Sequence, residues 1–222
     1  MDGILLVDKP LDWTSHDVVA KVRSIIKTGT AQKIKIGHTG TLDPAATGLL
    51  VLVLGSYTKK ASDFSKLDKT YEAELTLGQE STTGDNEGEK RKISGKQPTL
   101  GEIEEVLKRF TGKIKQTPPV YSAIKVDGQR AYRLARQGKQ IKLESREVSI
   151  YKVSDITYDY PRLGFTARVS SGTYIRSLAE DIGQSLGTGA YLSALRRTKV
   201  GQLSLKDAQN LSELSLNTIA AL

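Results

Sequence analysis

The chain has 222 residues, a formal net charge of +8 and an isoelectric point near 9.5. It contains no cysteine and only two histidines, which excludes a disulfide framework and argues against a zinc site. The apolar run at residues 4–7 is too short, and its flank too acidic, for a signal peptide or a membrane span. We therefore expect a cytoplasmic protein, and the positive charge favours a polyanionic partner.

The N-terminal part predicts a strand followed by a helix. Residues 4–7 are apolar and predict a short buried strand, which the turn at Lys9 ends. After Thr14, which offers a helix N-cap, apolar residues recur at i, i+4, i+7 and i+8. This spacing predicts an amphipathic helix, with a basic connector beginning at Lys27. We interpret Lys9 as a structural residue.

A loop rich in glycine and threonine comes next. Residues 37–48 contain three glycines and three threonines, which favours a shaped loop over a helix or strand. The apolar run 49–54 predicts a buried strand or the core of a helix. Asp43 is the loop's only acidic residue, and Pro44 biases it towards an extended conformation. A lone acid on a stiff loop suits a nucleophile or a general base, although Asp43 and Thr47 also fit a turn that caps a following helix.

The middle of the chain predicts a strand, a polar loop and a helix. Apolar and polar residues alternate over residues 69–78, which predicts a half-buried strand with Tyr71 as a core aromatic. The loop 82–88 contains Asp85 and is most simply an Asx-type turn. Thr99 begins a capping box, and the apolar spacing after it predicts a scaffold helix.

Residues 112–150 differ in composition from the rest of the chain, because nine of them are basic and only three are acidic. Aromatic residues and the pair Pro118-Pro119 are interleaved with these charges. A run of charge is usually a solvated face. The interleaved aromatics favour instead an element that grips phosphates.

Two strands and a helix are predicted beyond this segment. Alternation predicts strands at 148–158 and 163–170, and apolar residues at helical spacing predict a helix over 175–186. Arg176 lies in the first turn of that helix. The simplest interpretation places Arg176 on the surface, paired with Glu180 at i, i+4.

Several of these stretches together resemble the TruB family of pseudouridine synthases, which isomerise a uridine in the T arm of tRNA. They read G-H-T-G-T-L-D-P-A-A-T-G-L-L (37–50), K-T-Y (69–71), P-P-V-Y-S-A-I-K (118–125), G-T-Y-I-R (172–176) and A-Y-L-S-A-L-R-R-T (190–198). The resemblance runs through nearly the whole chain. It implies an α+β fold in which a central mixed, mostly antiparallel sheet is flanked by helices, with residues 112–150 as a basic thumb insertion.

The resemblance also implies roles for individual residues. It makes Asp43 the catalytic residue, with Arg176 as its ion-pair partner and Tyr71 stacked on the target base. It places His38 against the RNA near the flipped nucleotide. The other residues that it implicates are Tyr174 and Leu195 in the uracil pocket, Asp85 near the catalytic arginine, and Tyr121, Lys125 and Arg136 as RNA contacts in the thumb.

The implied reaction is an isomerisation, so no cofactor and no metal are expected. Breaking the bond between C1′ and N1 builds positive charge at C1′, which a close carboxylate can stabilise or trap. The uracil must first leave the RNA stack, which costs about a few kcal/mol. Stacking on Tyr71 returns roughly 1–3 kcal/mol of that cost. The sequence leaves open whether Asp43 attacks C1′, attacks C6 of the base, or acts first at C2′.

We expect one catalytic domain over residues 1–222, without the RNA-binding domain of the PUA type that family members usually carry at the C-terminus. It is expected to act as a monomer on the T stem-loop of tRNA, with no obligate protein partner and no membrane. Two alternatives remain. One is an RNA-binding or RNA-folding module with weak or lost catalysis, which has no need of Asp43, Tyr71 and Arg176 together. The other is a sugar hydrolase, which normally needs a second acid that no motif supplies.

Overall fold

The computed structural model describes residues 1–31, 33–122, 124–126, 128–139, 141 and 143–220, without the side chains at positions 132, 136 and 220. It divides into two compact units. The first unit contains Met1–Glu72 and Leu195–Leu222, and the second contains Ala73–Ala194. Two strands, β4 (Lys69–Leu77) and β12 (Ala190–Val200), contribute residues to both units.

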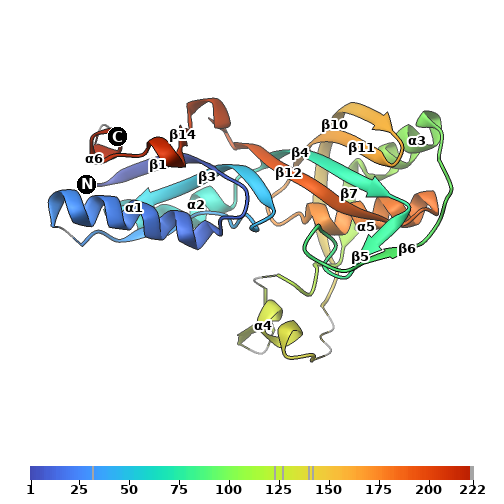
Figure 1. The fold of residues 1–222 in the computed structure, drawn as a ribbon, viewed down its shortest axis with the longest axis horizontal. Coiled ribbons are helices and arrows are strands. Elements are labelled where there is room, and N and C mark those ends of the chain that lie inside the picture. The colour runs from blue at the N-terminus through green and yellow to red at the C-terminus, as the bar shows by residue number, and fades with distance from the viewer. Residues whose placement is uncertain (32, 123, 127, 140, 142, 221–222) are drawn as a thin grey trace. The chain divides into compact units, whose positions relative to one another are not determined.

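The first unit is built on a mixed set of strands. Their order is β14-β1-β3-β12, with β2 also paired to β3 and β13 to β12 (Figure 1). The strand bounds are Gly3–Lys9 for β1, Ile36–His38 for β2, Ala46–Leu54 for β3, Leu203–Ser204 for β13 and Gln209–Asn210 for β14. The helices are α1 (Ser15–Thr30), α2 (Ala61–Ser65) and α6 (Leu216–Ala220), with single 3-10 turns at Gly55–Lys60, Leu205–Asp207 and Leu211–Glu213.

The apolar run after the glycine-rich loop is a strand. β3 pairs antiparallel with β1 along its length and parallel with β12 at its start. All of its residues from Gly48 to Leu54 are buried, which is why the run is apolar throughout instead of alternating. The loop before β3 therefore leads into a central strand, and the alternative of a capped helix after Asp43 is wrong.

Helix α1 begins where the sequence predicts and ends later. Thr14 is its N-cap in a capping box with Asp17, and its apolar stripe is buried. The expected connector at Lys27 is instead the last turn of the helix, which closes on Ala31 in the left-handed conformation. Gly29 lets the side chain of Leu216 in α6 pack closely on this turn, because a Cβ there would lie 2.4 Å from Cδ2 of Leu216.

The second unit combines antiparallel strands with three described helices, which are given below. Its strand order is β4-β11-β10-β7, and both β11 and β7 pair antiparallel with β10. The bounds are Gly112–Gln116 for β7, Arg146–Asp159 for β10 and Arg162–Val169 for β11. A separate hairpin joins β5 (Gln79–Ser81) to β6 (Lys90–Lys92). The predicted strands at 148–158 and 163–170 are thus confirmed.

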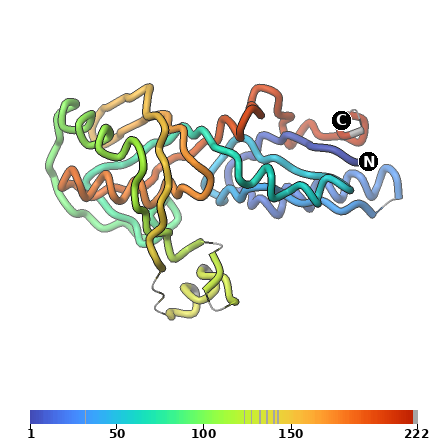
Figure 2. Tube along the Cα trace, turned by 180° about the vertical axis from the view of Figure 1, so that it is seen from behind, coloured from blue at the N-terminus to red at the C-terminus, as the bar shows by residue number. Residues whose placement is uncertain are grey.

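Helices α3 (Leu100–Phe110) and α5 (Ile175–Leu186) lie side by side in the second unit, seen from behind in Figure 2. Thr99 forms the predicted capping box with Glu102, and α5 has the predicted bounds. Gly187, in the left-handed conformation, ends α5. Of the strand pairs described in the two units, most are antiparallel, so the expectation of a mixed, mostly antiparallel α+β fold is confirmed.

The two ends of the insertion predicted over 112–150 are strand residues, of β7 and of β10. The part between Gln116 and Arg146, called the basic segment below, leaves the strands there. It contains the short hairpin β8 (Lys125–Val126) with β9 (Gln129–Arg130) and the helix α4 (Ala131–Arg136), drawn in yellow-green in Figure 1. Within the part of the chain that the structure describes, no helix is both long and apolar enough to cross a membrane.

Candidate active site

Asp43 lies half-buried in the loop between β2 and β3. The backbone carbonyl of Asp43 accepts a hydrogen bond from the N–H of Ala46 at 3.0 Å, which closes a tight turn before β3. The loop around this turn is short, and residues on both sides of Asp43 are bonded to other elements of the first unit. The carboxylate is thus presented on a backbone whose position is fixed.

Residues from the N-terminal strand and helix hold the two neighbours of Asp43. The buried hydroxyl of Ser15 accepts from the N–H of Leu42 at 2.8 Å and donates to its carbonyl at 2.9 Å. On the other side, the carbonyl of Pro44 accepts from the N–H of Asp12 at 3.0 Å and from Nζ of Lys9 at 3.4 Å. Such bonds restrict the directions in which the carboxylate can point.

Lys9 is completely buried beneath this loop. Its ammonium also donates to the carbonyls of Pro10 and Trp13, at 2.8 and 2.5 Å. Burial lowers the pKa of Lys9 from the ordinary 10.5 to about 8, and the nearby charge of Asp43 opposes that shift. The interpretation of Lys9 as structural fits these contacts, and its charge also acts on the candidate catalytic carboxylate.

Arg197 of β12 holds the start of the loop. Its guanidinium is buried and donates to the carbonyls of Leu49 at 2.8 Å, Gly40 at 2.9 Å and Thr41 at 3.5 Å. The backbone of β12 also approaches β3 closely at Gly48, whose φ is +98°. A Cβ on Gly48 would lie 2.4 Å from the carbonyl oxygen of Arg197, so only glycine fits there.

Three other predicted site residues belong to the first unit. His38 is half-buried in β2 and is the register partner of Leu52. Leu195 of β12 is the parallel register partner of Ala46, three residues after Asp43. Tyr71 of β4 is 9% exposed, so most of its ring is covered in this state.

In the second unit, Arg176 is buried and pairs with Asp85. The distance from its Nη1 to Oδ2 of Asp85 is 3.2 Å, and both side chains are less than a tenth exposed. The guanidinium also donates to the carbonyls of Thr83 at 3.1 Å and Tyr121 at 2.8 Å. The placement of Arg176 on the surface is therefore wrong, since Arg176 is buried against the 82–88 loop.

Asp85 is itself held by the loop in which it lies. Its Oδ1 accepts from the hydroxyl of Thr83 at 2.5 Å and from the N–H of Glu87 at 3.0 Å, which is the expected Asx-type turn. The loop is closed against β12 by a bond from the N–H of Leu192 to the carbonyl of Gly84. Asp43 and Arg176 belong to different units, and their ion pair stays a prediction.

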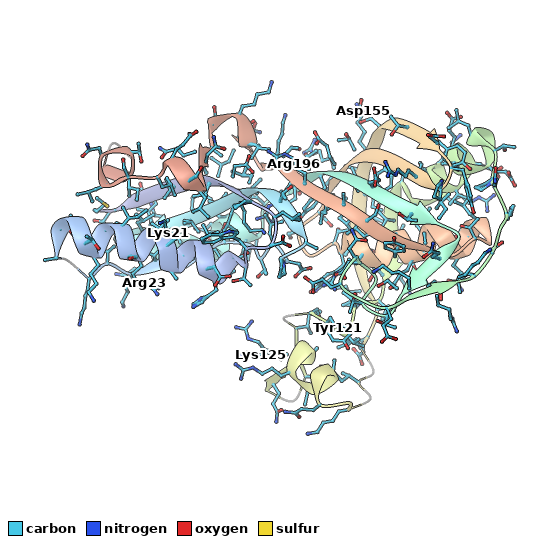
Figure 3. All side chains as sticks on the ribbon, viewed as in Figure 1. Lys21, Arg23, Tyr121, Lys125, Asp155 and Arg196 are labelled. Atoms are coloured by element: carbon cyan, nitrogen blue, oxygen red, sulfur yellow. The ribbon has the colours of Figure 1, made fainter. Side chains whose placement is uncertain are left out.

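The remaining predicted residues lie at or beyond the base of the basic segment. Tyr174 is half-buried and is the N-cap residue of α5. Tyr121 is half-buried and Lys125 is exposed, both on the segment that carries α4 (Figure 3). Arg136 is the last residue of α4, and its side chain lies outside the described residues. In the described ranges, no group of three acidic, histidine or cysteine side chains is placed to hold a metal ion.

The sequence profile of the N-terminal domain of the TruB family pseudouridylate synthases matches residues 26–175. The chain belongs to the TruB family. A second profile, that of the tRNA pseudouridylate synthase B C-terminal domain, matches residues 176–220. Membership of the TruB family confirms the predicted pseudouridine synthase fold.

Among the relatives in the TruB family, tRNA pseudouridine synthase B of Burkholderia lata is 45% identical over 215 residues, which cover 97% of this chain and 65% of the relative. The enzyme of the same name from Cupriavidus metallidurans is 45% identical over 217 residues, which cover 96% and 67%. A chain from a solved Cbf5–Nop10–Gar1 complex matches with a TM-score of 0.72 and 30% identity, over 96% of this chain and 53% of that one. The chain thus spans about two thirds of these curated relatives and about half of the solved chain.

Sequence reasoning missed three residues that shape this site. Ser15 directly follows the N-cap of α1, and Arg197 belongs to the 190–198 stretch, in which only Leu195 is predicted to line the site. Gln116 of β7 carries no local signal at all, yet its buried side chain bonds the backbone of Tyr174. All three act through bonds to residues distant in sequence, which local spacing does not reveal.

Proposed function

We propose that this protein isomerises uridine to pseudouridine at position 55 in the T stem-loop of tRNA, with Asp43 as the catalytic group. The observation that carries the proposal is the position of Asp43 within the TruB-matching segment, on a loop bonded on both sides to β1, α1 and β12. The relatives are named tRNA pseudouridine synthase B, which supports tRNA as the substrate. The proposal includes a cytoplasmic monomer that needs no cofactor.

The reaction rearranges bonds within one nucleotide. The bond from C1′ to N1 breaks, the uracil turns, and a bond from C1′ to C5 forms. The proton on C5 leaves to water and N1 gains one, so the product is an isomer of the substrate. An ionised Asp43 stabilises or traps the positive charge that develops at C1′, as the nucleophile of a retaining glycosidase does.

The neighbours of Asp43 serve this chemistry by keeping the carboxylate in place. A carboxylate that must approach C1′ of a flipped nucleotide reacts faster when its position is already fixed, because orienting it during the reaction would raise the activation free energy. Ser15, Lys9 and Arg197 bond the backbone on both sides of Asp43.

Contacts to the RNA are assigned to the remaining residues. Tyr71 stacks on the target base, His38 occupies the space that the base leaves, and Leu195 and Tyr174 line the uracil pocket. The basic segment with Tyr121, Lys125 and Arg136 binds phosphates and supplies the affinity that does not depend on the base.

The experiment uses a tRNA transcript with tritium at C5 of its uridines. We expect release of one equivalent of tritium per tRNA, and none from a transcript in which uridine 55 is replaced by cytidine. Tight binding without any release would make the protein an RNA-binding module. Equal release from both transcripts would assign the reaction to another position.

A further inference from the structure

The basic segment begins and ends at two residues that lie side by side. β7 ends at Gln116 and β10 begins at Arg146, and these two residues are register partners across the antiparallel pair. Residues 117–145 leave the strands between them, so Gln116 and Arg146 form the neck of the segment. Both side chains contact the same residue, Tyr174, which the proposed function places in the wall of the uracil pocket.

Gln116 binds the backbone of Tyr174 in two directions. Its Oε1 accepts from the N–H of Tyr174 at 2.8 Å, and its Nε2 donates to the carbonyl at 3.0 Å. Gln116 is 1% exposed, so water does not compete for these bonds. The carbonyl of Tyr174 also accepts from the N–H of Leu178 in α5. The backbone of Tyr174 is therefore fixed between β7 and α5.

Arg146 contacts the ring of Tyr174 and the turn before it. Its guanidinium carbon lies 5.1 Å from the ring centroid, within the range of a cation–π contact. Nη2 of Arg146 donates to the carbonyl of Gly172. Gly172 has a φ of +82°, and a Cβ there would lie 3.2 Å from Nη2, so glycine leaves room for the guanidinium. Nε of Arg146 is buried and has no hydrogen-bond partner among the described residues.

The first residues of the segment are bonded to the first turn of α5. The hydroxyl of Ser177 donates to the carbonyl of Thr117 at 2.9 Å, and Arg176 donates to the carbonyl of Tyr121 at 2.8 Å. The neck thus contacts the backbone and ring of Tyr174, and the residues that follow Gln116 bond the two residues of α5 at 176 and 177. A change in the neck would reach Tyr174 directly.

We propose that Gln116 and Arg146 are positioning residues, which set the backbone and the ring of Tyr174 and so shape the pocket for the target base. The inference rests on the proposed function and adds to it two residues that act through Tyr174 instead of through the RNA. Arg146 is then distinct from the basic residues further along the segment: its charge serves the ring of Tyr174 and not a phosphate.

The test is a double-mutant cycle of Arg146→Gln with Tyr174→Leu, read as the single-turnover rate of tritium release at saturating tRNA. We expect Arg146→Gln to slow release about tenfold or more, because small misplacements of a pocket wall reduce rate strongly. In the Tyr174→Leu background, Arg146→Gln should have little further effect, because the ring that it positions is absent. The affinity for tRNA and its salt dependence should stay as in the native protein.

Other variants keep the inference falsifiable. Arg146→Lys retains the charge but loses the planar stack and should stay slow. Gln116→Met should also slow release, and it should keep part of its effect in the Tyr174→Leu background, because the backbone that Gln116 bonds is still present there. Arg162→Gln, an exposed arginine of β11 in the same unit, is the control and should release tritium at the native rate.

Three results would overturn the inference. Weaker binding with a reduced salt slope and a native rate would make Arg146 a phosphate contact. If the effect of Arg146→Gln adds fully to that of Tyr174→Leu, Arg146 is a residue of general structural importance. If Arg146→Gln and Gln116→Met both release tritium at the native rate, neither residue positions Tyr174. If the native protein itself releases no tritium, the proposed function fails and this inference fails with it.

Discussion

Of the four lysine and arginine side chains that are buried in the described part of the chain, three bond a loop with a candidate site residue; the fourth, Lys69, bonds the carbonyls of Ser65 and Leu67. Lys9, Arg176 and Arg197 are each less than a tenth exposed, and their donors meet mainly backbone carbonyls. Removing a charge from water is costly unless its hydrogen bonds are replaced. In each case at least one of the carbonyls belongs to a loop that contains a candidate site residue, the Asp43 loop or the Asp85 loop. We infer that these cations exist to fix loops.

Replacing Arg176 by lysine tests this at one residue. Lysine keeps the charge but lacks the planar fork that bonds Asp85, Thr83 and Tyr121 together. We expect Arg176→Lys to lower the single-turnover rate roughly 100-fold or more, while tRNA affinity changes little. Arg109→Lys, at an exposed position of α3, is the matched control. A native rate in Arg176→Lys would remove Arg176 from the catalytic residues.

The lowered pKa of Lys9 predicts how the stability of the protein depends on pH. Its pKa is about 8 in the folded protein and 10.5 in the unfolded chain, so between these values the unfolded chain binds more protons. The stability of the native protein, relative to that of Lys9→Met, should therefore rise as the pH increases from about 8 to 10.5. Urea denaturation of both proteins across this window measures the difference. A constant difference would show that burial does not perturb Lys9.

At the scale of elements, the features set by local sequence could be predicted, whereas those set by contacts distant in sequence could not. The capping box at Thr99 predicts the start of α3, and the apolar spacing from Ile175 to Leu186 predicts α5, because caps and periodicity act within a few residues. The last turn of α1 was not predictable, because Gly29 reads as a helix breaker until Leu216 is seen packed against it. Likewise, nothing near Arg176 in sequence indicates that it pairs with Asp85.

The same division applies to the candidate site. Asp43 was identifiable because a long motif surrounds it, whereas Arg197 contributes through β12, more than a hundred residues later in the chain. The pairing of β12 with β3 brings Arg197 to the loop, and the register of that pairing cannot be predicted from local composition. Resemblance to a family supplied the roles of residues that physical reasoning on spacing alone treated as core or surface.

The hydrogen bonds from Arg197 of β12 to the Asp43 loop predict that replacing this arginine lowers the stability of the protein. In Arg197→Lys, the ammonium can reach only part of the set formed by the carbonyls of Gly40 and Leu49, and the remainder is buried without a donor. One unsatisfied carbonyl costs about 1–3 kcal/mol, so we expect a destabilisation of about 1–3 kcal/mol. Urea denaturation measures it, and a change below about 0.5 kcal/mol, typical of surface substitutions, would contradict the clamp.

The basic segment predicts a salt effect. If it binds phosphates, Lys125→Glu should weaken tRNA binding and lower the slope of log affinity against log salt by roughly 0.7–0.9 per lost contact. Lys108→Glu, an exposed lysine of α3, makes the same charge change outside the segment. Equal salt slopes of tRNA binding in the native protein and Lys125→Glu would mean that Lys125 is a solvated surface residue that contacts no phosphate.

At the scale of the whole molecule, the candidate residues are shared between the two units. His38, Asp43, Tyr71 and Leu195 belong to the first unit, and Asp85, Tyr174 and Arg176 to the second. Family membership extends across both, since the two TruB profiles together match residues 26–220. The account of function therefore depends on the whole chain, and its central claim is that Asp43 carries the chemistry.

The most direct test of that claim is tritium release by Asp43→Asn, measured together with its affinity for tRNA. The amide has nearly the shape of the carboxylate but cannot stabilise positive charge at C1′. We predict that release falls below detection while the tRNA affinity stays within about twofold of native, a difference of less than about 0.5 kcal/mol. Asp63→Asn, at an exposed position of α2, should release tritium at the native rate. Release by Asp43→Asn at a rate comparable to the native protein would contradict the account.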